Sequence, residues 1–180
     1  MLVVNLFGVP SAGKSTGAAY IFAKLKLAGI NAELVTEFAK DEVWNGSVEP
    51  FNCQEYLFGN QSYRLSRLKN NVDVVVTDSP LPLTILYNNN PILGESFDTT
   101  VMNVFNSYQN LNFLLNRVKK YNPVGRFQTE EESNALKEPV VNLLNTLDID
   151  YLVYDGSEED YNKIIEEIKN TLKSNLSFSS

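Results

Sequence analysis

The chain has 180 residues, of which 43% are hydrophobic and 21% charged, a composition typical of one globular domain with a full core. It contains no histidine, which excludes Ser-His-Asp and Cys-His catalysis and every His-ligated metal site. The single cysteine, Cys53, excludes an internal disulfide and favours a reducing compartment, while the formal net charge of −7 is concentrated in residues 148–167.

Apolar runs and helical patterns alternate along the chain. The runs typical of buried strands are LVVNLF (2–7), AELVT (32–36), VDVVVT (72–77), NFLL (112–115) and DYLVY (150–154). Apolar residues at helical spacing occupy 14–29, 53–70 and 159–172. The alternation predicts a three-layer α/β fold, a parallel five-stranded sheet with helices on both faces. Within 130–147, Pro139 predicts either a kink or a helix that starts at Pro139.

We expect one domain over residues 1–173 and a disordered tail over residues 174–180. No apolar run approaches the ~20 residues that a transmembrane helix needs. The N-terminal residues also lack the basic leader of a signal peptide. We therefore expect a cytoplasmic protein with no membrane partner.

The segment GVPSAGKST (8–16) lies between the first expected strand and the first expected helix, and it matches the phosphate-loop pattern G-x-x-x-x-G-K-[ST]. Backbone N–H groups of such a loop point at phosphate oxygens, at the positive end of the helix dipole. Lys14 is expected to reach the β- and γ-phosphates of ATP, and the Ser15 hydroxyl to bind Mg²⁺. The expected nucleotide contacts are Gly8, Val9, Pro10, Ser11, Ala12, Gly13, Lys14, Ser15 and Thr16. We call these nine residues the P-loop.

Asp78 directly follows the third expected strand, in VDVVVTDSP. In P-loop proteins an acid at this place lies beside the loop and holds Mg²⁺, so we expect Asp78 to share the ion with Ser15. An alternative is that Asp78 only caps the turn that begins at Ser79 and Pro80.

Glu37 ends the second expected strand, in LVTEFAKD. Ligands of parallel sheets gather at the carboxyl ends of the strands, so Glu37 is the candidate general base in a chain without histidine. Asp41, one helical turn further, is the second candidate. The alternative for Glu37 is a solvated residue at a helix start.

The segment NRVKKYNPVGRFQTEEES (116–133), which we call the lid segment, combines basic residues with a proline, a glycine and an acidic run. We expect Arg117 and Arg126 to neutralise charge on the transferring phosphoryl group, and the segment to exclude water as a basic lid. Lys119 and Lys120 are weaker candidates, and a solvated loop paired with the acidic run is the alternative.

Together, these motifs resemble the nucleoside and nucleotide kinase branch of the P-loop proteins. GNQSYRLSRLKNNVDVVVTDSP (59–80) is similar to ribosylnicotinamide-kinase-type ATPases. LVTEFAKD (34–41), VDVVVTDSPLPL (72–83) and FNSYQNLNFLLNRVKKYNPVGRFQTEEES (105–133) resemble more closely the phage 5-hydroxymethyluracil DNA kinases. The resemblance covers roughly residues 2–170.

This resemblance implies a thymidylate-kinase-like P-loop NTPase fold and transfer of phosphate from ATP to the 5-hydroxymethyl group of a base in DNA, a step toward hypermodified thymidines. It implies ATP binding by the P-loop, Mg²⁺ binding by Asp78 and a lid at NPVGR (122–126). Two alternatives stay open. One is a kinase for a nucleoside, a nucleoside monophosphate or ribosylnicotinamide, and the other is an ATPase switch that moves a partner.

A DNA acceptor makes a geometric prediction about two basic stretches, residues 60–71 and 112–128. Both should share one face with the ATP site, because DNA binding relies on contacts between basic side chains and phosphates. Arg64 and Arg67 stand three residues apart on one expected helix and are candidates for such contacts, with a solvated helix face as the alternative.

Overall fold

The computed structural model describes residues 1–46, 52–122, 124 and 129–177. Its strands form a single sheet in the order β2-β3-β1-β4-β5, and every neighbouring pair is parallel. The strands are β1 (Leu2–Phe7), β2 (Ala32–Val35), β3 (Val74–Thr77), β4 (Gln109–Asn116) and β5 (Leu152–Asp155). The parallel five-stranded α/β fold expected from the sequence is therefore confirmed.

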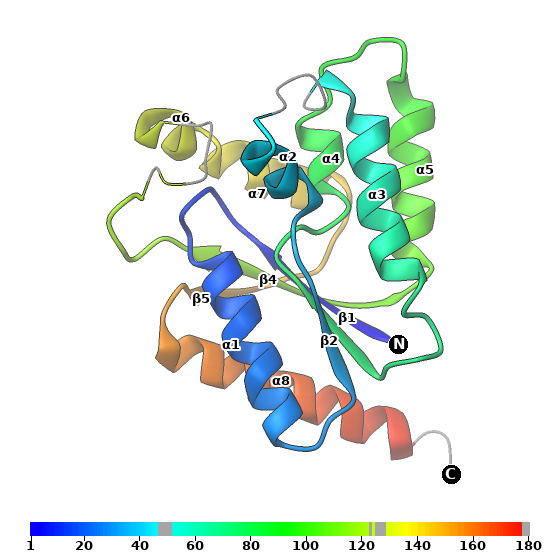
Figure 1. The fold of residues 1–180 in the computed structure, drawn as a ribbon, viewed down its shortest axis with the longest axis vertical. Helices are drawn as coiled ribbons and strands as arrows, with labels where there is room; N and C mark the ends of the chain where they lie inside the picture. The colour runs from blue at the N-terminus through cyan, green and yellow to red at the C-terminus, as the bar shows by residue number, and fades with distance from the viewer. Residues whose placement is uncertain (47–51, 123, 125–128, 178–180) are drawn as a thin grey trace.

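Helices cover both faces of this sheet (Figure 1). They are α1 (Lys14–Leu27), α2 (Phe38–Trp44), α3 (Gln54–Ser66), α4 (Leu83–Leu86), α5 (Gly94–Asn106), α6 (Glu130–Ala135), α7 (Lys137–Thr146) and α8 (Glu158–Ser177). Helices α1 and α8 pack on one face, while α3, α5 and α7 pack on the other. Helices α2 and α6 lie at the same edge of the sheet as the turn between β1 and α1.

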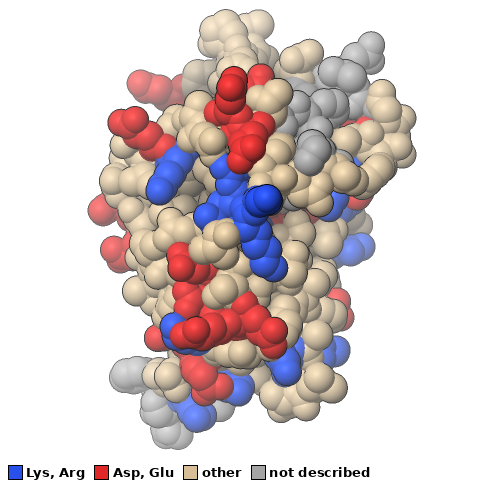
Figure 2. All heavy atoms as spheres, turned by 90° about the vertical axis from the view of Figure 1, so that its left-hand side faces the viewer, with Lys and Arg blue, Asp and Glu red and all other residues tan. Residues whose placement is uncertain are grey.

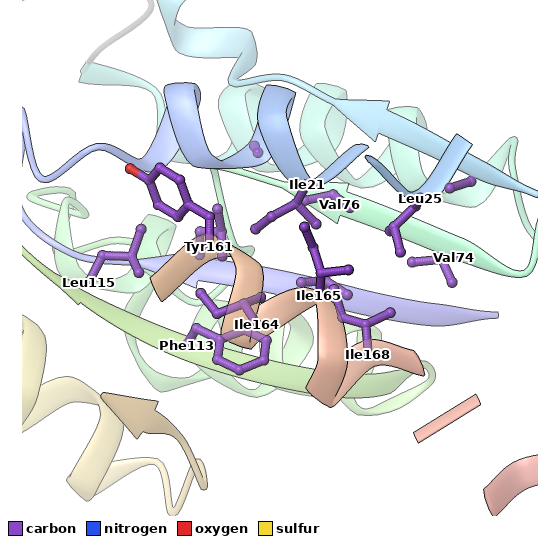
Figure 3. Packing of buried hydrophobic residues seen from close by; sticks show 14 of the residues in the cluster. Ile21, Leu25, Val74, Val76, Phe113, Leu115, Tyr161, Ile164, Ile165 and Ile168 are labelled. Carbon is purple, nitrogen blue, oxygen red and sulfur yellow. The ribbon is translucent and has the colours of Figure 1, made fainter. Parts of the chain in front are cut away.

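The core on the α1 and α8 face consists of apolar side chains from the strands and from these two helices. Leu2, Val4 and Leu6 of β1 point to this face, whereas Val3 points to the other. Figure 3 shows isoleucines of α8 packed against α1 and the strands, and the labelled residues are Ile21, Leu25, Val74, Val76, Phe113, Leu115, Tyr161, Ile164, Ile165 and Ile168. Because both faces of β1 are buried, both sets of alternating side chains are apolar, with the exception of the buried Asn5.

The strand β5 differs from the buried strand that the sequence indicated. It is the last strand of the sheet order, and Leu152 and Val153 are 45% and 55% exposed. An edge strand has only one neighbouring strand, so its side chains are less covered than those of β1.

The stretch 130–147 contains two helices. α6 ends at Ala135 and α7 begins at Lys137, so the break falls before Pro139 and the helix does not start at the proline. Pro139 lies in the first turn of α7, where the backbone N–H groups have no partner within the helix and a proline is tolerated.

Two further boundaries differ from expectation. The helix expected over 53–70 ends at Ser66, in a turn that leads through Asn70 with a positive φ of 68°. Helix α8 continues to Ser177, so residues 174–177, which we expected in a disordered tail, are helical; residues 178–180 lie outside the described residues. Among the described residues, no helix has both the length and the apolar character needed to cross a bilayer.

Candidate functional site

The P-loop joins β1 to α1 at the carboxyl edge of the sheet, and its two pattern glycines are required by geometry. Gly8 has a φ of 140°, and a Cβ there would lie 2.7 Å from the carbonyl oxygen of Leu115. Gly13 has a φ of 97° and would direct a Cβ into the Tyr161 hydroxyl. A side chain at either position would therefore strain the backbone and displace the neighbouring strand or helix.

Lys14 lies folded over the P-loop. Its Nζ donates hydrogen bonds to the carbonyl oxygens of Gly8 at 2.7 Å and Val9 at 3.1 Å. Ser15 and Thr16 are exposed in the first turn of α1, and no side chain among the described residues caps this helix start. The loop thus presents a cation, hydroxyls and a helix N-terminus together, which is the arrangement that binds phosphate.

Asp78 and Glu37 lie at the ends of neighbouring strands. Asp78 follows β3, is only 4% exposed, and accepts a hydrogen bond through Oδ1 from the backbone N–H of Glu37 at 3.0 Å. The register of β3 against β1 pairs Thr77 with Asn5, so Asp78 is level with Leu6, two residues before the P-loop. Of the expected site residues, the structure therefore brings Glu37, Asp78 and the P-loop to one edge.

Tyr87, a residue that the sequence analysis did not single out, belongs to the surroundings of Glu37. Burial, with a smaller contribution from the charge of Glu37, raises the pKa of the Tyr87 hydroxyl to about 12. Tyr87 follows the short helix α4, which begins five residues after Asp78. The fold therefore favours the neutral phenol, whose hydroxyl is a hydrogen-bond donor.

The second carboxylate candidate, Asp41, is engaged elsewhere. It forms an ion pair with Arg64 of α3. The Arg64 guanidinium also donates to the carbonyl oxygen of Thr36 at 3.3 Å and lies 5.0 Å from the ring centre of Phe38. Arg64 therefore fixes α2 to α3, whereas Glu37 contacts Asp78 through its backbone N–H.

Gln61 has a structural role that no motif revealed. It is 3% exposed, accepts a hydrogen bond from the backbone N–H of Phe38 at 2.9 Å and donates one to the carbonyl oxygen of Thr36 at 3.3 Å. These bonds hold the chain on either side of Glu37. A polar residue inside the apolar pattern of α3 was the only signal in the sequence.

The lid segment rests on the P-loop at two points. The Ser133 hydroxyl donates to the carbonyl oxygen of Pro10 at 2.9 Å, and the backbone N–H of Asn122 donates to the Ser11 hydroxyl at 3.1 Å. Arg117 directly follows β4 and donates to the Ser133 hydroxyl at 3.2 Å. The structure thus brings Arg117 to the P-loop, whereas Arg126 lies outside the described residues.

The charged side chains form separate groups on this side of the molecule. Figure 2 shows a basic group in the middle of the face, with acidic groups above and below it. Lys119 and Lys120, in the lid segment, are exposed. Lys69, from the other basic stretch, lies 5.6 Å from the ring centre of Tyr108, just before β4 begins. The P-loop follows the carboxyl end of β1, whereas Tyr108 precedes the amino end of β4, and these two strands are parallel. Lys69 therefore lies remote from the P-loop, and residues 60–71 do not share one face with it along their whole length.

A family model described as AAA domain matches residues 3–160. The chain belongs to this family. No curated protein matches the sequence of this AAA domain. Among solved structures, it is similar to deoxyadenosine kinase from M. mycoides with dCMP and dCDP bound, at 20% identity and a TM-score of 0.54, covering 96% of this chain and 99% of that one.

The AAA domain is also similar to shikimate kinase from Bacteroides thetaiotaomicron, at 14% identity and a TM-score of 0.48, covering 96% and 98% of the two chains. The first likeness establishes the fold: an α/β P-loop fold of the kinase type, with five parallel strands. This agrees with the fold class that the sequence indicated.

The oxygen atoms that this AAA domain offers to a metal ion suit Mg²⁺. Asp78 supplies a buried carboxylate at the strand edge, and Ser15 supplies an exposed hydroxyl at the start of α1. Mg²⁺ is usually held by one or two protein oxygens together with phosphates and water. The described residues contain no group of three or more acidic or cysteine side chains that could hold a metal by themselves, so the nucleotide would have to complete the coordination.

Proposed function

We propose that this AAA domain is an ATP- and Mg²⁺-dependent phosphotransferase that acts on an alcohol group. The observation that carries the proposal is the hydrogen bond between Glu37 and Asp78 at the edge where the P-loop lies. Asp78 offers a carboxylate to the Mg²⁺ ion that would accompany the bound nucleotide. A second acidic residue, Glu37, joined to Asp78 through its backbone in a chain without histidine, supports removal of a proton from an attacking hydroxyl.

Each residue has a defined task in this proposal. The P-loop amides and Lys14 bind and orient the β- and γ-phosphates, and Ser15 and Asp78 hold the ion. Mg²⁺, when bound, neutralises phosphate charge. Glu37 accepts the proton of the acceptor hydroxyl, whose oxygen forms the new bond to phosphorus while the bond to ADP breaks. Arg117 stabilises charge on the transferring group, and Arg126 is proposed to assist it.

The acceptor that the sequence resemblance favours is the 5-hydroxymethyl group of 5-hydroxymethyluracil in phage DNA. Lys119 and Lys120 are exposed in the lid segment, which rests on the P-loop, and they support a polyanionic partner. In this form of the proposal, the two lysines contact DNA phosphates while one modified base reaches Glu37.

A small nucleoside or nucleotide is the second candidate acceptor, and two contacts favour it. Arg64 is already paired with Asp41, and Lys69 lies by Tyr108, at the end of β4 remote from the P-loop. Both residues are therefore poorly placed for a DNA backbone that crosses the site. The similar deoxyadenosine kinase structure contains dCMP and dCDP as products, and both are small nucleotides.

The test is transfer of label from γ-labelled ATP in the presence of Mg²⁺. The acceptors are duplex DNA with and without 5-hydroxymethyluracil, free nucleosides, nucleoside monophosphates and ribosylnicotinamide, each with the Lys14→Ala variant as a blank. Label in the modified DNA alone supports the first acceptor, and label in a small molecule alone supports the second. Free phosphate with no labelled acceptor contradicts the phosphotransferase and favours an ATPase switch.

A further inference from the structure

Ser133 joins the lid segment to the P-loop through a single buried hydroxyl. Its side chain has no exposed surface, at 0%. The hydroxyl donates its proton to the carbonyl oxygen of Pro10 at 2.9 Å and accepts a hydrogen bond from Nη1 of Arg117 at 3.2 Å. Because a hydroxyl has one proton to donate, the direction of both bonds is fixed. The chain of contacts therefore runs from Arg117 through Ser133 to the backbone of the P-loop.

The other groups near the Arg117 guanidinium are more exposed to solvent than Ser133. Nη2 of the guanidinium donates a hydrogen bond to Oδ1 of the exposed Asn134, and the group lies 5.5 Å from the ring centre of Tyr121 and 4.0 Å from a carboxylate oxygen of Glu130. The Glu130 side chain is 61% exposed, whereas that of Arg117 is 13% exposed. An ion pair with an exposed partner at this distance contributes little in water. The bond to Ser133 thus gives the guanidinium a hydrogen bond whose acceptor side chain is fully buried.

The start of helix α6 is stabilised without help from the Ser133 side chain. Its first turn is a capping box, in which the Thr129 hydroxyl accepts from the backbone N–H of Glu132 at 3.2 Å and the Glu132 carboxylate accepts from the backbone N–H of Thr129 at 2.7 Å. Such a box stabilises a helix start on its own. Removal of the Ser133 hydroxyl therefore removes its hydrogen bonds to Pro10 and Arg117, and helix α6 is expected to stay folded.

We propose that Ser133 is a positioning residue that holds Arg117 against the P-loop before any nucleotide binds. The proposal rests on the proposed function, in which Arg117 acts on the transferring phosphoryl group. Ser133→Ala leaves Arg117 with its more exposed partners and leaves the Pro10 carbonyl without this donor. Since the lost orientation matters in the transition state, we expect kcat to fall about tenfold and the KM for ATP to stay within about twofold.

A double-mutant cycle that combines Ser133→Ala with Arg117→Ala tests this mechanism. Activity is measured as phosphate transfer to the acceptor that the labelling experiment identifies, or as ATP hydrolysis if that experiment identifies no acceptor. If Ser133 acts through Arg117, Ser133→Ala has no further effect in the Arg117→Ala background. Ser133→Thr keeps the hydroxyl and is expected to retain more activity than Ser133→Ala. Ser107→Ala is the matched control, because its hydroxyl also donates to a backbone carbonyl, that of Val104 at 2.7 Å, but at the end of α5. An additive cycle, or normal kcat for Ser133→Ala, overturns the proposal.

Hydrogen–deuterium exchange of the nucleotide-free full-length chain tests the link without any activity. Ser133→Ala is expected to raise amide exchange in residues 8–13 and 116–122, and Ser107→Ala to leave both segments unchanged. Wild-type exchange in both segments of Ser133→Ala contradicts the link. If Lys14→Ala keeps full activity, the proposed function fails and the exchange result still decides the role of Ser133. If Lys14→Ala is inactive and the cycle is additive, only the role of Ser133 fails.

Discussion

The backbone N–H of Glu37 donates a hydrogen bond to Oδ1 of Asp78 at 3.0 Å, and this contact ties the end of β2 to the end of β3. The backbone of the proposed base is therefore held by the proposed metal ligand. The contact uses the main chain of Glu37, so the side chain of either residue can be changed in a conservative way without removing it. This separation makes the two roles testable one at a time.

Glu37→Gln is expected to reduce kcat by about 100-fold or more, with a much smaller change in ATP affinity, because a general base acts only in the transition state. Glutamine keeps the backbone bond to Asp78. Steady-state kinetics and a direct ATP-binding measurement separate the two effects. Glu42→Gln, on the same helix, is the control, and Asp41→Asn is expected to have the smaller effect because Asp41 is paired with Arg64. A loss of ATP affinity alone would show that Glu37 is not the base.

Asp78→Asn is expected to raise the Mg²⁺ concentration needed for half-maximal activity by about tenfold or more. Asparagine still offers an oxygen to the Glu37 backbone, so the strand ends stay joined while the negative charge is lost. The measurement is a Mg²⁺ titration of activity at saturating ATP. Asp73→Asn, at the exposed residue before β3, serves as the control for loss of one carboxylate. An unchanged titration would leave Asp78 with the capping role only.

Lys14→Ala is expected to abolish ATP-dependent activity and to leave the fold intact. The Lys14 ammonium group donates hydrogen bonds to the carbonyl oxygens of Gly8 and Val9, which lie in the P-loop and not in a strand or helix. Circular dichroism checks the fold, and ATP binding and turnover check the site. Lys26→Ala, exposed in the last turn of the same helix, is expected to behave as wild type. Near-normal turnover of Lys14→Ala would refute the phosphate-binding role of the P-loop.

The positions of the strand ends were predictable because each strand of this parallel sheet is a local apolar run in the sequence. An apolar run followed by a glycine-rich segment or an acid places Lys14, Glu37 and Asp78 at one edge, and the structure has them there. Their chemical roles stay predictions. The roles of Ser133 and Gln61 were not predictable, since each acts through a contact with a backbone group far away in the sequence, and the motifs that contain them give no sign of such a contact.

The start of β4 and helix α5 were not predicted correctly from the sequence, and each failure has a specific cause. Strand β4 begins at Gln109, earlier than expected, because Asn110 and Asn112 fill polar positions that face Asn5 of β1. The Asn5 amide donates to both of their side-chain oxygens, at 3.0 and 2.9 Å. Hydropathy alone cannot reveal a buried amide cluster of this kind. Helix α5 was missed although Phe97, Val101 and Phe105 follow one another at four-residue spacing, which is a helical signal that was present in the sequence.

The titration of Tyr87 tests its closeness to Glu37. Its pKa is raised from 10.0 to about 12, so the fold favours the neutral phenol. The resulting contribution to stability is complete below pH 10 and is lost as the pH rises from about 10 through about 12. Glu37→Gln removes the smaller of the two causes and is expected to lower the pKa of Tyr87, while burial keeps it above its ordinary value.

The measurement for Tyr87 is the ultraviolet absorbance of tyrosinate after rapid mixing to high pH, before the chain unfolds. The difference between wild type and Tyr87→Phe isolates this residue from the other tyrosines. Glu42→Gln is the control for a lost carboxylate on α2. If Glu37→Gln leaves the Tyr87 titration where it was, the two side chains do not interact.

Gly17→Ala is expected to destabilise the fold, although alanine is the better helix former. A Cβ at Gly17 would lie 2.6 Å from Cε1 and 3.0 Å from Cζ of Tyr161. The Tyr161 ring cannot easily move, because it is 2% exposed and its hydroxyl donates to the carbonyl oxygen of Gly13 at 2.9 Å. Overpacking of this kind costs about 1–3 kcal/mol, which exceeds the gain in helix propensity of about 1 kcal/mol.

Gly59→Ala is the matched substitution, because Gly59 lies in α3 and a Cβ there meets nothing within 4 Å. It is expected to raise the free energy of unfolding by about 0.5–1 kcal/mol through propensity alone. Urea denaturation of the two variants and the wild type measures both effects. Equal stabilisation by the two substitutions would show that Tyr161 yields to the added methyl group and does not hold the start of α1 in place. Opposite signs would establish that the contact between α8 and the first turn of α1 supports the P-loop.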